Sequence, residues 1–268
     1  MRLLTLTAAL ALLLATPVSA DWVKLDDFQG DLSNWTTNEF FDAESEIVTD
    51  PDCGTNNVLF VGQSDGGVED SSNAYMSLGG DNIASGDTGT LFGRMRTGGP
   101  LTETDGHFGL STESAPDEWG DFSAYLTENG QWSVRDDGYK TTDLQPAAET
   151  WINFWIVVDN PNDEYHVYCN TTYGEDADSG DQMSHSTNDK DFAFRSGTGA
   201  LAMQTLLIRA SNANEDGWYL DDLYIDSSSQ NLSNPVSEPA LIPEPLTMVG
   251  LILSIGTVGA YAKRSYRR

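Results

Sequence analysis

The sequence predicts an all-β fold, an antiparallel jelly-roll-like β-sandwich, on two observations. Short runs of β-branched and aromatic residues recur along the chain, separated by clusters of Gly, Asp, Asn and Ser, and these compositions are typical of strands and turns. No long segment shows the 3.6-residue apolar period of an amphipathic helix, apart from the two ends of the chain. Many short strands joined by turns favour two packed sheets.

The clearest strands form a hairpin in the middle of the chain. Residues 151–158 are apolar on both faces, which predicts a central strand. The turn-forming residues 159–163 follow, and residues 164–171 form the partner strand. Further strands are expected at residues 57–62, 74–78, 90–96, 107–111, 122–126, 131–135, 192–195, 201–209 and 218–226.

The N-terminal residues 1–20 are typical of a signal peptide. Arg2 precedes an apolar run over residues 3–14, and Val18-Ser19-Ala20 offers the small residues that signal peptidase requires. The mature chain is therefore expected to begin at Asp21. Residues 21–226 are expected to form the sandwich, and residues 227–242, rich in Ser, Asn, Pro and Glu, a flexible linker.

The C-terminal residues 243–268 have the layout of a membrane anchor. The uncharged residues 246–262 would span about 25 Å as a helix, close to the roughly 30 Å hydrocarbon core of a bilayer. A basic cluster follows them: Lys263, Arg264, Arg267 and Arg268. Because basic residues stay on the cytoplasmic side, the body of the chain is expected outside. A buried core helix is the alternative.

This tail resembles the PEP-CTERM sorting domain of Gram-negative bacteria. The resemblance rests on Pro243-Glu244-Pro245, the hydrophobic span and the basic terminus, in that order. It implies recognition by an exosortase, processing near the motif, and transfer from the inner membrane to the cell surface or extracellular matrix. It covers residues 243–268 only and implies nothing about the activity of the exported body.

The exported part, residues 21–242, is strongly acidic. It carries eight basic and 41 acidic side chains, a net charge of −33. Nucleic acid is excluded as a partner, because phosphate binding needs clustered Lys and Arg. The acidity suits divalent cations, and adaptation to a salty medium explains it equally well.

Two cysteines, Cys53 and Cys169, both lie in the exported part. In an oxidising compartment they predict one disulfide, worth about 4 kcal/mol by restricting the unfolded chain. Two buried free thiols are the alternative. A zinc site is not expected, because the sequence has three histidines and neither CxxC nor HExxH spacing.

Two short motifs match catalytic patterns only in part. Residues 62–66 have the letters of a GxSxG nucleophile elbow, but the polar residues after them form a poor helix, which favours a hairpin loop. Glu103-Thr104-Asp105 begins the Glu-x-Asp-x-x-Glu pattern of some glucanases, but Phe108 stands at the final position. No catalytic residue is assigned.

The exported body resembles a concanavalin A-like or carbohydrate-binding-module jelly roll. The resemblance rests on residues 25–28, 151–155 and 219–226, and it implies that the first and last strands lie side by side. Asp26 and Asp27 would then face Asp221 and Asp222, an oxygen-rich site suited to Ca²⁺. Residues 176–181 also resemble part of a calcium loop. Solvated loop acids are the alternative in both places.

Four aromatic residues beside Asp, Gly or Asn are candidate platforms for stacking on sugar rings: Trp119, Trp132, Tyr139 and Trp218. Core positions are the alternative for each, and Trp151 and Trp155 are expected in the core. The expected function is non-catalytic, a structural or glycan-associated component of the cell surface or matrix, with polysaccharide as partner. The alternative is a polysaccharide-active enzyme of the concanavalin A-like class, a glycoside hydrolase or lyase.

Overall fold

The computed structural model describes residues 21–40, 43–63, 71–101, 105–116, 119–185, 189–211 and 217–236. The chain divides into two units after Pro235, and apart from Val236 the described residues belong to the first unit. The expected signal peptide, Pro243–Pro245 motif, membrane span and basic cluster lie outside the described residues. Among the residues that are described, no helix is long and apolar enough to cross a membrane.

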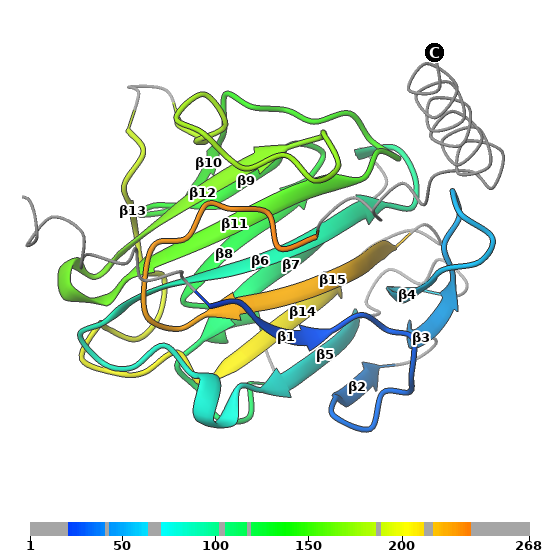
Figure 1. Ribbon diagram of the computed structural model, residues 1–268, viewed down its shortest axis with the longest axis horizontal. Helices are drawn as coiled ribbons and strands as arrows, with labels where there is room; N and C mark the ends of the chain where they lie inside the picture. The colour runs from blue at the N-terminus through cyan, green and yellow to red at the C-terminus, as the bar shows by residue number, and fades with distance from the viewer. Residues whose placement is uncertain are drawn as a thin grey trace, which may run out of the picture. The chain divides into compact units, whose positions relative to one another are not determined.

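The described strands form two antiparallel sheets, which confirms the predicted all-β sandwich (Figure 1). Sheet A has the order β13-β12-β11-β6-β15-β4-β3, and β1 also pairs with β15. Its strands are β1 (Val23–Asp26), β3 (Ala43–Thr49), β4 (Asn57–Gln63), β6 (Thr88–Thr97), β11 (Ile152–Asp159), β12 (Glu164–Asn170), β13 (Phe192–Ala193) and β15 (Trp218–Asp226).

Sheet B has the order β10-β9-β8-β7-β14-β5-β2. Its strands are β2 (Thr36–Phe40), β5 (Ser71–Ser77), β7 (Asp105–Ser111), β8 (Ala124–Asn129), β9 (Trp132–Arg135), β10 (Tyr139–Thr141) and β14 (Thr205–Ser211). Short 3₁₀ turns occur at η1 (Gly79–Asp81), η3 (Trp119–Asp121) and η4 (Asn160–Asn162). The chain passes between the sheets repeatedly, so neighbours within a sheet are mostly distant in sequence.

The predicted central hairpin is confirmed. β11 lies between β12 and β6, and seven of its eight residues are buried. Its turn begins with the η4 segment, which contains a proline, and ends at Asp163 in the left-handed conformation (φ 58°), one that Asp tolerates better than most residues. Phe154 points into the core between the sheets, whereas Trp155 is buried on the other side of sheet A.

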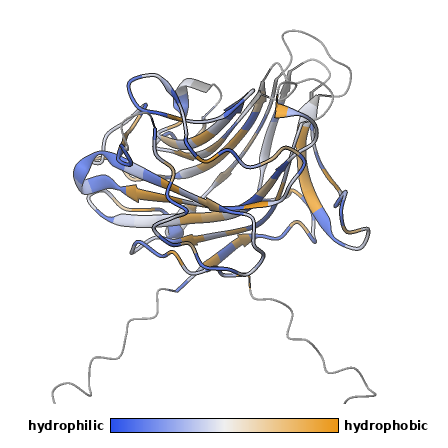
Figure 2. Cartoon of the chain, turned by 90° about the horizontal axis from the view of Figure 1, so that it is seen from above, coloured by the Kyte–Doolittle hydropathy of each residue, from blue (hydrophilic) through white to orange (hydrophobic). Residues whose placement is uncertain are grey.

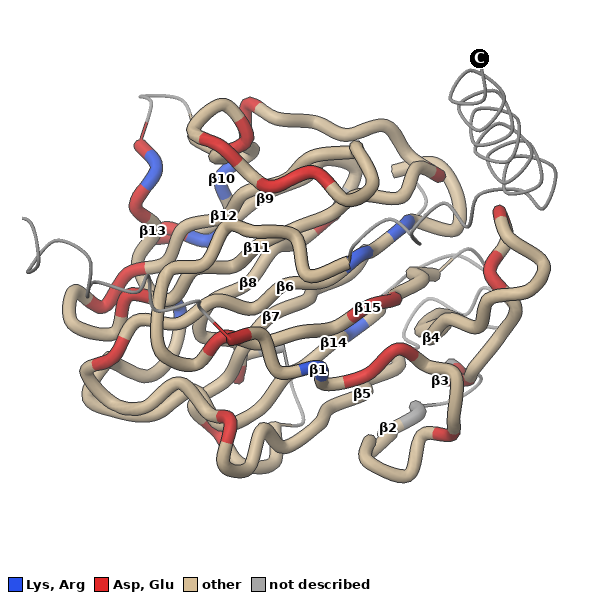
Figure 3. Tube along the Cα trace, in the orientation of Figure 1, with Lys and Arg blue, Asp and Glu red and all other residues tan. Residues whose placement is uncertain are grey.

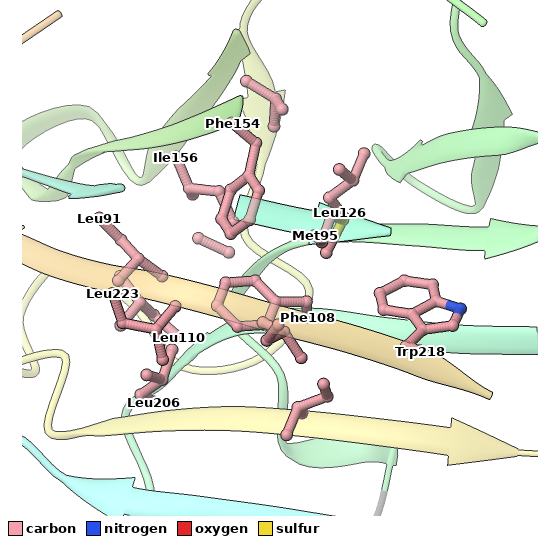
Figure 4. Packing of buried hydrophobic residues seen from close by; sticks show 14 of the residues in the cluster. Leu91, Met95, Phe108, Leu110, Leu126, Phe154, Ile156, Leu206, Trp218 and Leu223 are labelled. Carbon is pink, nitrogen blue, oxygen red and sulfur yellow. The ribbon is translucent and has the colours of Figure 1, made fainter. Parts of the chain in front are cut away.

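The core lies between the two sheets and is rich in aromatic side chains. Phe108 of β7 and Phe154 of β11 meet edge to face across it, with ring centroids 4.7 Å apart (Figure 4). Figure 2 shows hydrophobic residues gathered on the strands and hydrophilic ones in the connecting loops. The candidate ligand sites lie on the outer faces of the two sheets, where some strands alternate core residues with charged or polar ones.

The residues after β15 are packed against sheet A, at least as far as the structure describes them, so the linker expected from residue 227 is not free there. Thr90 Oγ1 donates to the Ser229 carbonyl and accepts from the Asn231 backbone N–H, both at 2.9 Å. The Ser233 carbonyl accepts from Trp155 Nε1 at 3.2 Å. A Ser- and Asn-rich segment can thus cover a sheet through its hydrogen bonds, which composition alone does not reveal.

Candidate functional site

A β-bulge in the last strand creates the candidate site. Leu220 and Leu223 of β15 both enter the core, so two residues, Asp221 and Asp222, lie between them where regular alternation has one. The register with β6 shifts at this point, and Asp222 has φ 52°. Such an extra residue bends a strand locally and re-aims its side chains.

Gly93 of β6 lies beside this bulge and leaves room for it. A Cβ atom added at Gly93 would lie 2.6 Å from the Phe154 ring and 2.7 Å from Leu223 Cδ2. The missing side chain lets both core residues occupy this space. The bulge is therefore accommodated from the core side as well as by the strand itself.

An open cavity of about 470 Å³ lies over the bulge, on the outer face of sheet A. Its lining combines acidic, amide and aromatic side chains with a single guanidinium. The lining residues are Asp27, Gln29, Asp50, Asp52, Cys53, Asn56, Arg94, Trp151, Tyr173, Asp221 and Asp222.

Arg94 is the central cation of this cavity. Its Nη1 lies 3.3 Å from Asp222 Oδ2 and 3.9 Å from Asp221 Oδ2. Its guanidinium carbon lies 5.1 Å from the ring centroid of Trp151 and 4.7 Å from that of Tyr173. A guanidinium placed between two aromatic rings and two carboxylates is held by both cation–π attraction and ion pairing.

Asp221 is the most perturbed acid of the cavity. Its side chain accepts hydrogen bonds from Asn56 Nδ2 at 2.8 Å and from the Asp222 backbone N–H at 2.9 Å. Burial, and then the negative charge of Asp222, raise its pKa to about 7, against the opposing effect of Arg94. Burial also raises the pKa of Asp222, although Arg94 opposes that shift. The site therefore holds an acid that exchanges its proton near neutral pH.

The four aspartates expected to bind calcium do come to one end of sheet A, because β1 pairs with β15 as the resemblance implied. Their oxygens, however, are used within the protein. Asp26 accepts from Trp35 Nε1 and from the Phe28 backbone N–H, both at 2.8 Å, and Asp27 pairs with Lys24. Arg94 lies beside the other two carboxylates and pairs with them.

A different group has the geometry of a metal site. Ligand atoms of Asp136, His185 and Asp189 all lie within 4.8 Å of one another, and this is the one such group found among the described residues. His185 Nε2 lies 3.1 Å from Asp136 Oδ2. Sequence reasoning missed it because Asp136 is about 50 residues from His185 and Asp189 in the chain, and no motif spacing joins it to them. The expected calcium loop at residues 176–181 is a turn whose own side chains cap its backbone.

The structure places the aromatic residues predicted to stack on sugars in different environments. Trp132 and Trp218 are 2% and 1% exposed and pack against each other in the core, with ring centroids 5.9 Å apart, so their assignment as sugar platforms is corrected. Tyr139 is 51% exposed, as a platform requires. The side chain of Trp119 lies outside the described part. Trp151, which we expected in the core, lines the cavity.

The predicted disulfide is also corrected, because both cysteines are free in this structure. Cys169 is buried in the core, and burial raises the pKa of its thiol to about 12. Cys53 is exposed beside the cavity, and a hydrogen bond with Thr55 lowers its pKa. The two residues lie on opposite sides of sheet A. Most of the GxSxG-like stretch and Glu103 lie outside the described residues.

No protein-family model matches the sequence, and no curated protein matches it. A sialidase matches the fold with a TM-score of 0.51 and 12% identity, over 79% of this chain and 19% of that chain. This chain thus spans about a fifth of that sialidase.

Two further structures are similar. One is a carbohydrate esterase from the Shiga toxin-encoding bacteriophage phi24B (TM-score 0.48, 10% identity, 74% of this chain and 92% of that chain). The other is the exoplasmic/lumenal domain of VIP36 with Ca²⁺ and Man3GlcNAc. Its TM-score is 0.47 at 9% identity, over 79% of this chain and 90% of that chain. At these identities the likeness concerns the fold alone.

Proposed function

We propose that the protein binds glycan through the cavity over the β15 bulge, as a non-catalytic component of the cell surface or extracellular matrix. The observation that carries this proposal is the open cavity in which two aromatic residues, a guanidinium and several carboxylates converge. Sugars need this combination, because their C–H faces pack on flat rings and their hydroxyls exchange hydrogen bonds with charged groups.

The roles of individual residues follow from their contacts. Tyr173 is 39% exposed, so part of its ring is available to a sugar. Arg94 contacts both the Tyr173 and the Trp151 rings, which links the two aromatic side chains of the cavity. Asp222, whose side chain is 18% exposed, offers an acceptor oxygen to hydroxyl groups, and the bulge fixes its direction. The rigidity of this arrangement supports binding with little ordering cost.

The test is affinity electrophoresis of the full-length chain through gels that contain neutral polysaccharides: cellulose derivative, xylan, mannan and dextran. We expect at least one polymer to retard the wild type, and Tyr173→Ala to lose most of that retardation, since stacking on one ring contributes about 1–3 kcal/mol in comparable ring contacts. Leu201→Ala, which truncates an exposed side chain that does not line the cavity, is the control. Equal retardation of both variants would contradict the site, and no retardation of folded protein would contradict the function.

Export and sorting are part of the same proposal. The motif Pro243-Glu244-Pro245, the apolar residues 246–262 and the basic end support processing by an exosortase after signal peptidase has removed residues 1–20. Mass spectrometry of the protein from a Gram-negative host with and without an exosortase measures both termini. A C-terminus that stays at Arg268 in both strains would contradict the sorting step.

Asp221 favours a second candidate function, the cleavage of polysaccharide. A carboxyl with a pKa near 7 beside a second carboxylate can act as a general acid at neutral pH. Release of reducing ends from any polymer that binds, abolished in Asp221→Asn, would establish an enzyme. Binding without such release over days would leave the non-catalytic function.

Apart from the calcium expected at Asp26, Asp27, Asp221 and Asp222, the grouping of Asp136, His185 and Asp189 supports a divalent-cation site. An imidazole with two carboxylates suits zinc or manganese better than calcium, which takes oxygen ligands. Thermal unfolding with each ion and with chelator tests this, and Asp189→Asn should remove any stabilisation. If calcium raises the melting temperature of the wild type and of Asp189→Asn equally, the ion binds at another place and this site is contradicted.

A further inference from the structure

The outer face of sheet B gathers three of the eight basic residues of the exported part. Arg209 of β14 lies opposite His107 of β7 in the strand register. The guanidinium carbon of Arg135, at the end of β9, lies 5.3 Å from the ring centroid of Tyr139. Arg195 follows β13, and its backbone N–H bonds to a carbonyl next to β8. The charges of all three arginines act on the His107 ring, so all three lie near it.

His107 fixes the centre of this face. Its side chain is buried, and its Nε2 lies 3.1 Å from the Tyr139 hydroxyl. Its Nδ1 is buried without a hydrogen-bond partner among the described residues. Burial, and then the arginine charges, lower the pKa of His107 to about 3, so the ring is neutral at physiological pH. The positive charge of the face therefore comes from the arginines alone.

A polar hollow continues this face beyond the histidine. It has a volume of about 210 Å³ and is lined by Thr127, Gln131, Ser133, Tyr139 and Thr141. Thr127 pairs with His107 on one side and with Ser133 on the other, so the hollow and the histidine share one face of the sheet. Its hydroxyls and amide are hydrogen-bonding groups suited to sugar hydroxyls.

We propose that this arginine–tyrosine face binds the carboxylate-bearing rings of an acidic polysaccharide. The sugar ring would stack on Tyr139 with its hydroxyls in the hollow, and its carboxylate would accept hydrogen bonds from the guanidinium groups. Planar guanidinium groups match carboxylates in a bidentate manner. This site lies on the sheet opposite to the cavity over β15 and goes beyond the proposed function, because it selects for negative charge.

The clustering of three arginines on this face is informative because the rest of residues 21–242 is strongly acidic. Figure 3 shows acidic positions outnumbering basic ones along the described trace. With a net charge of −33, residues 21–242 as a whole repel an acidic polymer, whereas a local cluster of arginines attracts it over a few ångströms. Salt shortens the range of the repulsion from about 30 Å at 0.01 M to about 8 Å at 0.15 M. Binding of an acidic oligosaccharide should therefore strengthen from very low to physiological salt.

The test is calorimetric titration of the full-length chain, in mild detergent, with a trigalacturonate and with its fully methyl-esterified form. The ester keeps the rings and removes the charge. We expect the acid to bind about tenfold more tightly or better, and Arg195→Gln and Arg209→Gln each to weaken it about tenfold, as for the loss of one charge-assisted hydrogen bond. Lys140→Gln is the control, because it removes the same charge from β10 at the position next to Tyr139.

Four results would overturn the proposal. Equal binding of acid and ester would show that charge is not recognised. An unchanged affinity in both arginine variants, or an equal loss in Lys140→Gln, would show that this face is not the site. Equal affinity for a sulfated trisaccharide would keep an anion site but overturn the assignment to uronates. Because Tyr173→Ala affects only the other sheet, it should leave trigalacturonate binding unchanged, which separates this site from the proposed one.

Discussion

The variant Asp221→Asn should gain stability relative to the wild type as the pH rises. The folded-state pKa of Asp221 is about 7, against about 3.9 for an unperturbed aspartate. Between these values the folded protein holds a proton that the unfolded chain has released, so the wild type loses stability with rising pH. A shift of this size corresponds to about 4 kcal/mol in total, of which roughly 2.5 kcal/mol falls between pH 5 and pH 8.

The variant also carries a cost that does not come from titration. An amide has one acceptor oxygen, whereas both oxygens of Asp221 accept hydrogen bonds, from Asn56 and from the Asp222 backbone, and the loss of one such bond destabilises by about 1 kcal/mol. The informative quantity is therefore the difference in unfolding free energy between variant and wild type, followed from pH 5 to pH 8 by urea denaturation. This range stays above the sequence pI of about 4.1, where solubility is lowest.

Asp87→Asn is the matched control, since Asp87 is exposed and its replacement should leave the slope unchanged. A difference between Asp221→Asn and wild type that stays constant across the range would refute the reasoning. It would mean that Asp221 is ionised throughout, with Arg94 compensating its burial more fully than the geometry indicates.

Three further predictions concern the interior. His107→Gln should gain about 2 kcal/mol of stability relative to the wild type between pH 7 and pH 5. In the wild type, His107 has a folded-state pKa of about 3, so protonation of the unfolded chain destabilises the fold as the pH falls. An equal change in unfolding free energy for variant and wild type between the two pH values would contradict this. Gly93→Ala should destabilise by about 1–3 kcal/mol through overpacking, whereas Gly80→Ala, with open space around it, should cost less, and thermal melts compare them. A thiol reagent at pH 8 should label Cys53 at once and Cys169 only after unfolding. If neither cysteine of the unfolded protein reacts until a reductant is added, the two form the disulfide first predicted.

The strands could be predicted because their signal is local. Each apolar run that we assigned to a strand overlaps one in the structure, including the central β11. The strands that were missed, β2, β3 and β10, are polar and lie at or near sheet edges, where one face or less is buried. Their sequences therefore lack the apolar alternation on which the prediction depends.

The orientation of the aromatic residues could have been predicted better for two of them. Trp132 alternates with Val134, and Trp218 with Leu220, so each shares a strand face with an aliphatic residue and belongs to the core. Trp151 is different, because β11 is apolar on both faces and alternation cannot say which one faces the other sheet. Only the register with β6 and the covering segment after β15 decide that.

The candidate site itself was signalled by a break in a pattern. Regular alternation places one residue between two that face the core, yet Leu220 and Leu223 have two acids between them. The extra residue requires a bulge, and a bulge in an interior strand needs a partner that can give way, which Gly93 provides. Asp222 also adopts a conformation that costs about 1 kcal/mol or more for residues other than glycine. A strand that served only to close the sheet would gain stability by losing this irregularity. Its presence, with two carboxylates beside one guanidinium, is the structural feature on which the proposed binding site rests.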